Sequence, residues 1–393
     1  MGKRKKSSLL GNPVVAKPVT ECGSIDEVFK ESLTSFGGGY LKRIYKILFE
    51  IFEKNIPLVV TIAGPITISD QHQAWLIPLL KTGRVAYLTV TDAICYHDAH
   101  DSLGVFAERQ IKEVPIFGDD GQLRDEGIIR ITDTGFHEKV LFDQDRMISA
   151  ILQRPEFQKA MTTTERNFLL GKYYDAQEKF VQARPGLLST CHHMGIPVFV
   201  GAPGDGSAFL NSMKLWKMSQ LSLGYWYQHS IDIHQDVYEA CAYHNWGLFM
   251  SPAKKMAILI LGGGVPKNYA LQPEPTLSQI FGLPNIKGYD YDVQIVSAPV
   301  TDGSLSSCFP SEAVSWGKIN KKTYRQKTES MQGDYSAIMP LMMFSLLKKF
   351  PGINAGYHLF SRRDELTKKL DEKIKKNLLK MGKTNSFPLA LKD

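Results

Sequence analysis

The segment Ser311–Lys318 brings together side chains whose types and spacing could do chemistry. Glu312, Trp316 and Lys318 lie within seven positions. If the segment is helical, Glu312 and Trp316 share one face, and Gly317 ends the turn so that the lysine projects alone. A lysine buried beside an aromatic ring has a lowered pKa, and its neutral amine can attack a carbonyl or imine carbon. The alternative interpretation is a surface lysine at a helix end beside a core tryptophan.

Loops of small and polar residues provide a second candidate site. Predicted buried strands run directly into Gly201–Ser207, Gly262–Asn268 and Ala298–Ser304, which are rich in Gly, Ala, Ser and Asp. Ligands bind α/β sheets at the carboxyl ends of the strands. Three such loops together predict a nucleotide-sized site, although the glycine triplet alone is a weak signal.

The elements that must position these residues follow an α/β pattern. Apolar runs predict strands, and apolar residues at helical spacing predict helices. The predicted strands are 56–64, 85–91, 196–200, 256–261 and 292–297, and the helical segments are 25–53 with an interruption at the glycines of 35–39, 71–81, 138–190 and 337–347. The Lys-rich residues 319–333 are predicted to form a loop. The strand–helix–strand order predicts a doubly wound, mostly parallel sheet flanked by helices.

Composition limits the class of protein. The chain has 393 residues, of which 43% are hydrophobic, and we expect a globular protein. No run approaches the roughly 18 apolar residues of a membrane span, and the start has no apolar signal core. The five cysteines are odd in number and far apart, which favours a reducing cytoplasm and argues against disulfides or structural zinc.

The net charge of +7 comes from the two ends of the chain. Residues 3–6 contribute +4 and the segment from Asp364 to Lys383 contributes +3, so the body is neutral. We therefore expect an extended basic arm over residues 1–20, one domain over 21–360 and a charged, partly helical tail over 361–393. Contact between the basic ends and RNA is the weaker alternative, and no specific nucleic-acid partner is expected.

Two clusters with metal-binding or nucleophilic side chains carry less weight. His97, Asp98 and His100 are of metal-ligating types, and the spacing of the two histidines can place them on one helical face, but no third ligand partner is evident for that pair. We therefore expect these residues to line a pocket with polar groups and to bind no metal. Cys191 beside two histidines is weak support for a nucleophilic dyad, because neighbouring side chains diverge.

The segment Glu312–Lys318, Glu-Ala-Val-Ser-Trp-Gly-Lys, resembles the signature of the deoxyhypusine synthase family, and more closely its prokaryotic deoxyhypusine synthase-like branch. Further matches occur in order over about residues 30–350: 61–64 (Thr-Ile-Ala-Gly), 131–133 (Ile-Thr-Asp), 205–207 (Asp-Gly-Ser), 260–268 (Ile-Leu-Gly-Gly-Gly-Val-Pro-Lys-Asn), 302–304 (Asp-Gly-Ser) and Asp334. The resemblance thus covers nearly the whole chain except its two ends.

The resemblance implies a Rossmann-like, NAD-binding catalytic domain in a homotetramer with active sites at subunit interfaces. In that family NAD takes a hydride from a polyamine carbon, the resulting imine exchanges onto the lysine that matches Lys318, and the aminobutyl group passes to an acceptor amine. Residue by residue, the dinucleotide positions match Ser35, Ala63, Gly64, Asp205, Gly263, Ser297, Ala298 and Asp334. The amine-site positions match Asn268, Gly303, Ser304, Glu312 and Trp316. A carboxylate and an aromatic face suit a polyammonium substrate.

Four departures from the family pattern concern the amine. Asn268 stands where eukaryotic members carry a histidine, and Leu210, Leu305 and Ile68 stand where they carry acids. Each lost carboxylate removes a partner for an ammonium group, so the donor could be spermidine or putrescine. The acceptor could be a protein lysine, giving deoxyhypusine, or a diamine such as putrescine, giving homospermidine. The alternative is a non-catalytic homologue that binds NAD or polyamine.

Overall fold

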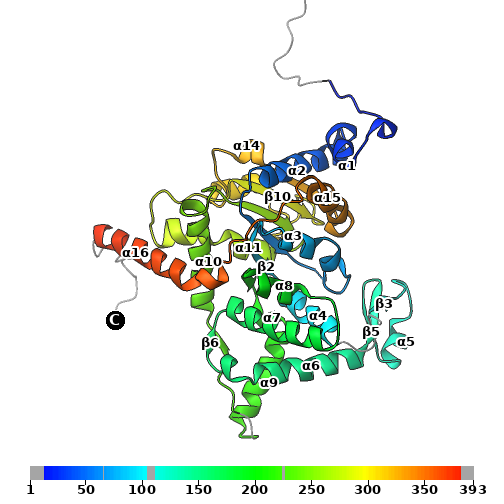
Figure 1. Cartoon of the computed structure of the whole chain (residues 1–393), viewed down its shortest axis with the longest axis vertical. Helices are drawn as coiled ribbons and strands as arrows, with labels where there is room; N and C mark the ends of the chain where they lie inside the picture. The colour runs from blue at the N-terminus through cyan, green and yellow to red at the C-terminus, as the bar shows by residue number, and fades with distance from the viewer. Residues whose placement is uncertain (1–12, 65, 104–110, 224–225, 382–393) are drawn as a thin grey trace, which may run out of the picture.

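The structure is a computed structural model that describes residues 13–381 except residues 65, 104–110 and 224–225 (Figure 1). Residues 1–12 of the expected basic arm and residues 382–393 of the expected tail therefore lie outside the described residues. Among the described residues, no helix is long and apolar enough to cross a membrane.

A six-stranded parallel sheet forms the centre of the molecule. Its strands are β1 (Leu58–Ile62), β2 (Val85–Val90), β7 (Val198–Val200), β9 (Ala257–Leu261), β10 (Tyr291–Val296) and β11 (Thr328–Gln332). They lie side by side in the order β11-β10-β9-β1-β2-β7, and every pair is parallel. The chain builds outward from β1 in one direction and then restarts at β9 on its other side. This reversal is the topological switch point of a Rossmann-type sheet.

Helices cover both faces of the sheet, because successive strand side chains point to opposite sides. Leu58 and Val60 of β1 belong to one core cluster, whereas Val59 belongs to the other. The first cluster packs under α2 (Phe36–Glu53), α3 (Ile77–Lys81) and α15 (Tyr335–Lys349). The second packs under α10 (Ile233–Phe249), α11 (Gly264–Leu271) and α16 (Arg363–Met381). The predicted doubly wound α/β fold is confirmed.

A helical layer extends the β2–β7 side of the sheet. It consists of α4 (Asp92–Ser102), α6 (Glu138–Leu152), α7 (Thr163–Phe180), α8 (Leu187–Met194) and α9 (Ser207–Gln220), with the small strands β6 (Ala160–Met161) and β8 (Ser230–Ile231). A separate antiparallel sheet of β3 (Lys112–Glu113), β4 (Ile128–Ile131) and β5 (Thr134–His137) lies beside α5 (Asp120–Asp125) at the edge of the molecule (Figure 1). The shorter helices are α1 (Ile25–Glu27), α12 (Pro273–Pro275), α13 (Pro310–Ser315) and α14 (Tyr324–Lys327). The described residues also contain π-helical turns at Val28–Ser32, His72–Leu76 and Thr276–Ile280 and 3-10 turns at Val19–Glu21, Pro155–Phe157, Pro203–Asp205 and Phe360–Arg362.

Two predictions about individual elements are wrong. Residues 319–333 are not a plain loop, because they contain α14 and the edge strand β11. The glycines of 35–39 do not interrupt a helix; Gly37, Gly38 and Gly39 lie in the first turns of α2, and the break is at Leu33–Ser35. The predicted helical region 138–190 is present as three helices with short breaks.

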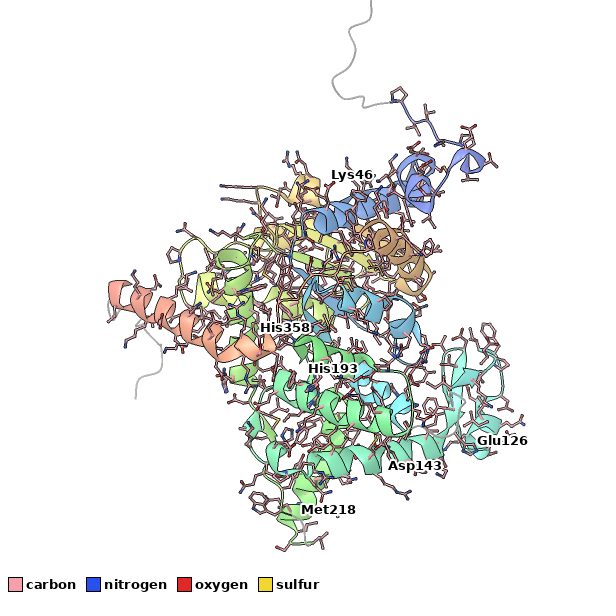
Figure 2. All side chains as sticks on the ribbon, in the orientation of Figure 1. Lys46, Glu126, Asp143, His193, Met218 and His358 are labelled. Carbon is pink, nitrogen blue, oxygen red and sulfur yellow. The ribbon has the colours of Figure 1, made fainter. Side chains whose placement is uncertain are left out.

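The structure also tests whether Cys191 forms a nucleophilic dyad with His193, which is labelled in Figure 2. Cys191 is buried in the core, whereas the labelled His193 is exposed and its Nε2 lies 2.8 Å from Asp175 Oδ1. Burial also raises the pKa of the Cys191 thiol, which disfavours the thiolate. The two side chains therefore do not form a nucleophilic pair.

Candidate active site

The backbone around Lys318 is fixed by the end of α13 and the start of β10. Trp316 caps α13, and Gly317 turns the chain with a φ of +81°. The Lys318 carbonyl then accepts a hydrogen bond of 3.0 Å from the Tyr289 amide, just before β10. The expected helical turn with a glycine at its end is confirmed. The lysine therefore leaves a rigid connection rather than a free loop.

The Lys318 side chain is half-buried and points toward α11. Its Nζ donates a hydrogen bond of 3.1 Å to Asn268 Oδ1 and lies 5.8 Å from the centre of the Trp316 ring. Burial lowers the pKa of Lys318, although the nearby Cys308 and Glu274 partly oppose the effect. The neutral amine is thus more accessible than in a surface lysine.

Glu274 of α12, which the sequence pattern did not indicate, lies near this lysine. A Cβ built on Gly317 would lie 2.5 Å from Glu274 Oε2, so the carboxylate contacts the backbone that leads into Lys318. The side chain is buried, and burial raises its pKa while the charge of Lys318 lowers it. No spacing in the sequence connects Pro-Glu-Pro at 273–275 with the signature segment.

A second lysine, Lys267, holds the loop that carries Gly303 and Ser304 through hydrogen bonds to its backbone. Lys267 of α11 is 2% exposed, and its Nζ donates to the carbonyl of Cys308 at 2.6 Å and to that of Ser306 at 3.3 Å. Gly303 and Ser304 remain exposed above these contacts, and a Cβ at Gly303 would meet nothing within 4 Å. Lys267 was not among the predicted site residues, because its function here is to hold carbonyl groups.

The residues in and directly after α13 that match the amine-site positions are open to solvent in the single chain. Glu312 is exposed, and Trp316 retains 58% of its accessible surface. Trp316 therefore does not belong to the core, which removes the interpretation of a surface lysine beside a core tryptophan. Lys318 is more buried than the tryptophan that precedes it.

Two of the glycine loops meet at the switch point between β1 and β9. Gly64 and Gly262 have φ values of +100° and +81°, which favour glycine. A Cβ on Gly262 would lie 2.8 Å from the Ala63 carbonyl oxygen, and one on Gly263 would lie 2.9 Å from the Ala63 Cβ. The Tyr335 hydroxyl donates to the same carbonyl at 3.1 Å. The glycines thus let the two loops pack backbone against backbone at the switch point, where side chains would clash.

The remaining dinucleotide positions surround the same sheet edge. Ala298 follows β10 and lines a pocket of about 340 Å³ together with Gly37 and Tyr40 of α2, the helix that Ser35 caps. Ser297 lies beside Ala298. Asp334 follows β11 and caps α15 by accepting a hydrogen bond of 2.8 Å from the Ser336 amide. Asp205 is exposed after β7, two strands away from β1.

The three leucine and isoleucine positions that depart from the family pattern differ in their exposure. Ile68 is 2% exposed and packs with Phe136 and Val140. Leu210 and Leu305 are 50% and 44% exposed. A Cβ built on Gly264 would lie 2.9 Å from the Leu305 Cβ, so this leucine closely borders the glycine loop.

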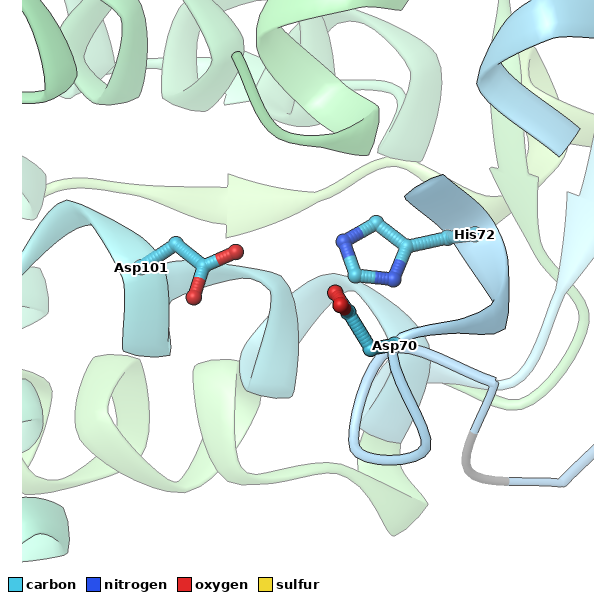
Figure 3. A group of neighbouring side chains, drawn as sticks. All are labelled: Asp70, His72 and Asp101. Carbon is cyan, nitrogen blue, oxygen red and sulfur yellow. The ribbon is translucent and has the colours of Figure 1, made fainter. Parts of the chain in front are cut away.

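The histidines singled out in the sequence do not form a metal site with Asp98. His97 Nδ1 and His100 Nε2 lie 3.0 Å apart. The Asp98 carboxylate instead accepts hydrogen bonds from the backbone amides of Leu187 and Leu188 at the start of α8. Instead, Asp70, His72 and Asp101 bring potential metal ligands within 4.8 Å of one another (Figure 3).

The cluster of Asp70, His72 and Asp101 already contains a positive charge. Arg184 Nη2 donates to both oxygens of Asp70, at 3.0 and 3.2 Å, and lies 3.7 Å from Asp101. The guanidinium therefore stands where a metal ion would neutralise these carboxylates, and we assign no metal to the cluster.

Comparisons with known proteins agree with the motif and the topology. The family model described as deoxyhypusine synthase matches residues 27–346. A deoxyhypusine synthase-like protein of Nostoc punctiforme is 34% identical over 87% of this chain and 85% of its own length. One from Thermosynechococcus vestitus is 30% identical over 93% and 88%, respectively. A protein named probable deoxyhypusine synthase 2 from Archaeoglobus fulgidus is 27% identical over 82% and 98%. The chain therefore belongs to the deoxyhypusine synthase family, a family of NAD-dependent aminobutyl transferases.

Proposed function

We propose that this protein transfers an aminobutyl group from a polyamine to an amine acceptor through an imine on Lys318. The observation that carries the proposal is the environment of the Lys318 amine: half-buried, lowered in pKa by burial, and held by Asn268 beside the Trp316 ring. A lysine must be neutral to attack an imine carbon, and this environment favours the neutral form.

NAD, when bound, would accept a hydride from the donor amine and later return it. The loops that carry Ala63, Gly64 and Gly263 lie at the switch point between β1 and β9, where sheets of this type bind dinucleotides, and a glycine backbone allows a ligand to approach closely. The other residues that we infer to hold the cofactor are Ser35, Asp205, Ser297, Ala298 and Asp334.

The amine would lie between α13 and the loop at Gly303 and Ser304. Glu312 would pair with an ammonium group, and the exposed face of Trp316 would contact it through a cation–π interaction. Asn268 would position the nitrogen of Lys318 by the hydrogen bond that it already accepts. Each of these residues offers an acceptor or an aromatic face, which suits a cationic substrate.

The chemistry on the protein is an exchange of amines. Lys318 Nζ forms a bond to the imine carbon of the oxidised donor, a proton moves from the attacking nitrogen to the leaving nitrogen, and the old carbon–nitrogen bond breaks. The leaving amine departs, and the aminobutyl carbon remains on Lys318 as a protonated imine. The acceptor amine then repeats the exchange in the opposite sense. Water must be kept out, because it would hydrolyse the imine.

The acceptor is either a protein lysine or a small diamine such as putrescine. Leu210, Leu305 and Ile68 provide no carboxylate at three positions where a long polyamine would need one. Fewer anionic partners favour a shorter amine, which supports putrescine as donor or acceptor. The same positions leave the Lys318 exchange unaffected, because none of these three residues accepts its amine.

Trapping the imine tests this proposal. The protein is incubated with NAD and spermidine, or with NAD and putrescine, treated with borohydride, and mapped by mass spectrometry. We expect a butylamine adduct on Lys318 that is absent without NAD and absent in Lys318→Arg. A folded wild-type protein that gives no adduct with either donor would instead be a non-catalytic homologue that binds NAD or polyamine.

A second measurement identifies the acceptor. Products formed from spermidine are compared with and without added putrescine. Homospermidine that depends on putrescine assigns a diamine acceptor, whereas transfer to a lysine-containing protein substrate assigns deoxyhypusine synthesis.

A further inference from the structure

Glu274 is a buried carboxylate that the proposed function does not yet use. It lies on α12 and is 5% exposed, and no described residue hydrogen-bonds its Oε2 atom. A buried carboxylate oxygen without a partner is unfavourable by itself, because desolvation of a charged group is costly. Such an atom calls for an explanation in terms of what it faces.

It faces the connection between Trp316 and Lys318. The idealised Cβ position of Gly317 is 2.5 Å from Oε2 and 2.9 Å from Oε1, so a side chain at position 317 would occupy the space that the carboxylate now fills. Gly317 also has the positive φ that favours glycine. The absence of a side chain therefore lets the carboxylate contact the backbone that leads into Lys318.

Other charged groups near Lys318 are turned to different partners. Lys267 of α11 donates to the carbonyls of Ser306 and Cys308. Glu312 of α13 is exposed, and the buried Asp292 of β10 interacts with Lys267. Cys308 contributes a thiol whose pKa burial raises, which disfavours its anionic form. Glu274 is thus the buried carboxylate whose charge acts directly on Lys318.

On the basis of the proposed function, we propose that Glu274 is a positioning residue. Its carboxylate supplies the counter-charge to Lys318 Nζ when this nitrogen is an ammonium group and when it belongs to the cationic imine. When the amine exchange leaves a protonated imine on Lys318, a positive charge is fixed in a half-buried site. An adjacent carboxylate stabilises that charge, and its own ionisation is favoured when the lysine is cationic. No electrons are exchanged with Glu274.

The charge coupling can be measured without cofactor or polyamine. Trace acetylation of the full-length protein at a series of pH values, with mass spectrometry of Lys318, gives the midpoint at which the amine becomes reactive. A nearby carboxylate raises a lysine pKa, so Glu274→Gln should lower this midpoint by about one pH unit. Glu274→Asp keeps the charge and should give a midpoint between those of the wild type and Glu274→Gln. If Glu274→Gln does not fold, the shift of the acetylation midpoint is measured in Glu274→Asp.

The imine can be measured separately with NAD and donor amine. Glu274→Gln should reduce the trapped Lys318 adduct roughly tenfold, although its lysine is more readily neutral. A merely structural defect would not make the amine more reactive and the imine scarcer at the same time. Glu178→Gln is a matched control, because Glu178 is also buried, also has a raised pKa and one oxygen without a described partner, and lies on α7.

The outcomes separate the two proposals. An unchanged acetylation midpoint in a folded Glu274→Gln variant would overturn the assignment of the counter-charge. A shifted midpoint with no adduct in the wild-type protein would keep the charge pair and remove the proposed transfer reaction. A shift of the same size in Glu178→Gln would also overturn the assignment.

Discussion

Gly317 connects helix α13 to Lys318 through a left-handed backbone conformation, and its missing side chain makes room for Glu274. We expect Gly317→Ala to misplace the lysine, because alanine is strained at a φ of +81° and its Cβ would overlap the carboxylate. The trapped Lys318 adduct should fall at least roughly tenfold, since a shift of about 1 Å in a reacting group has large effects. Gly352→Ala is the control, because a Cβ there meets nothing within 4 Å. Wild-type adduct levels in Gly317→Ala would contradict the argument.

The exposed Trp316 ring is expected to bind the donor amine rather than to support the fold. Trp316→Ala should raise the KM for the amine by about tenfold, which corresponds to the loss of a cation–π contact of about 1–2 kcal/mol. The thermal unfolding midpoint should change little. Steady-state kinetics with varied amine concentration test this prediction. The control is Phe117→Ala, because Phe117 is a fully exposed aromatic residue between β3 and α5. A large loss of thermal stability in Trp316→Ala would instead assign the ring to packing.

At the residue scale, the sequence predicted the groups that share one short segment but missed one that folding brings to it. The spacing of Trp316, Gly317 and Lys318 specified a turn, and the structure has that turn. Glu274 comes from another helix, and its burial and its contact with Gly317 exist only in the folded chain. No local pattern encodes such a contact.

At the element scale, the edge strand β11 is held to the sheet by charged contacts from α2. Glu50 of α2 pairs with Lys327, just before β11, and accepts a hydrogen bond of 3.2 Å from the Tyr291 hydroxyl of β10. Arg43 of the same helix pairs with Glu329 within β11. An edge strand has one unpaired side and few apolar contacts, so such pairs help to fix it.

Glu50 gives a prediction with a defined pH dependence. Burial alone would raise its pKa, but the hydrogen bonds and charges of Lys327 and Lys54 outweigh that effect and lower it from 4.5 to about 2. The unfolded chain therefore binds this proton more readily, and the stabilisation is complete above about pH 4.5 and lost as the pH falls toward 2. Glu50→Gln should lower the free energy of unfolding by about 1–2 kcal/mol at pH 7.

Urea unfolding of wild type and Glu50→Gln between pH 7 and the acid limit of folding measures this effect. The difference in the free energy of unfolding should shrink as the pH falls below about 4.5. Glu53→Gln is the control on the same helix, because Glu53 is exposed. A difference that stays constant with pH would show that the substitution acts through packing rather than through charge.

The same strand shows why some elements were predicted and others were not. The central strands are buried on both faces, and their continuous apolar runs are visible in the sequence. By contrast, β11 reads Thr-Glu-Ser-Met-Gln, because it is an edge strand with polar partners. Helix α10 was also not predicted, because most of its residues are buried and it lacks one apolar face.

At the scale of the whole molecule, the order of the strands brings the Ala63 and Gly262 loops together, and this order is a property of the assembled sheet. The long, mainly helical insertion between β2 and β9 contains β7 and several short strands and separates the two halves in sequence, yet β9 returns to pair with β1. Strand–helix–strand alternation predicted a doubly wound sheet. The meeting of the Ala63 and Gly262 loops depends on where the chain reverses, which only the pairing of β1 with β9 determines.

The exposure of Trp316 leads to the last prediction, which concerns assembly. A protonated imine on Lys318 needs protection from water, but the ring beside it is 58% exposed in the single chain. Val265, Val300 and Leu305, in the loops after β9 and β10, are also exposed. A second subunit lying over these residues would exclude water, so we expect a homotetramer with its active sites at subunit interfaces. Light scattering should give four times the chain mass of 44.1 kDa. Hydroxyl-radical footprinting should show Trp316 protected in the tetramer and modified after dilution into subunits, with loss of the Lys318 adduct. A monomer that forms the adduct with Trp316 fully reactive would contradict the prediction.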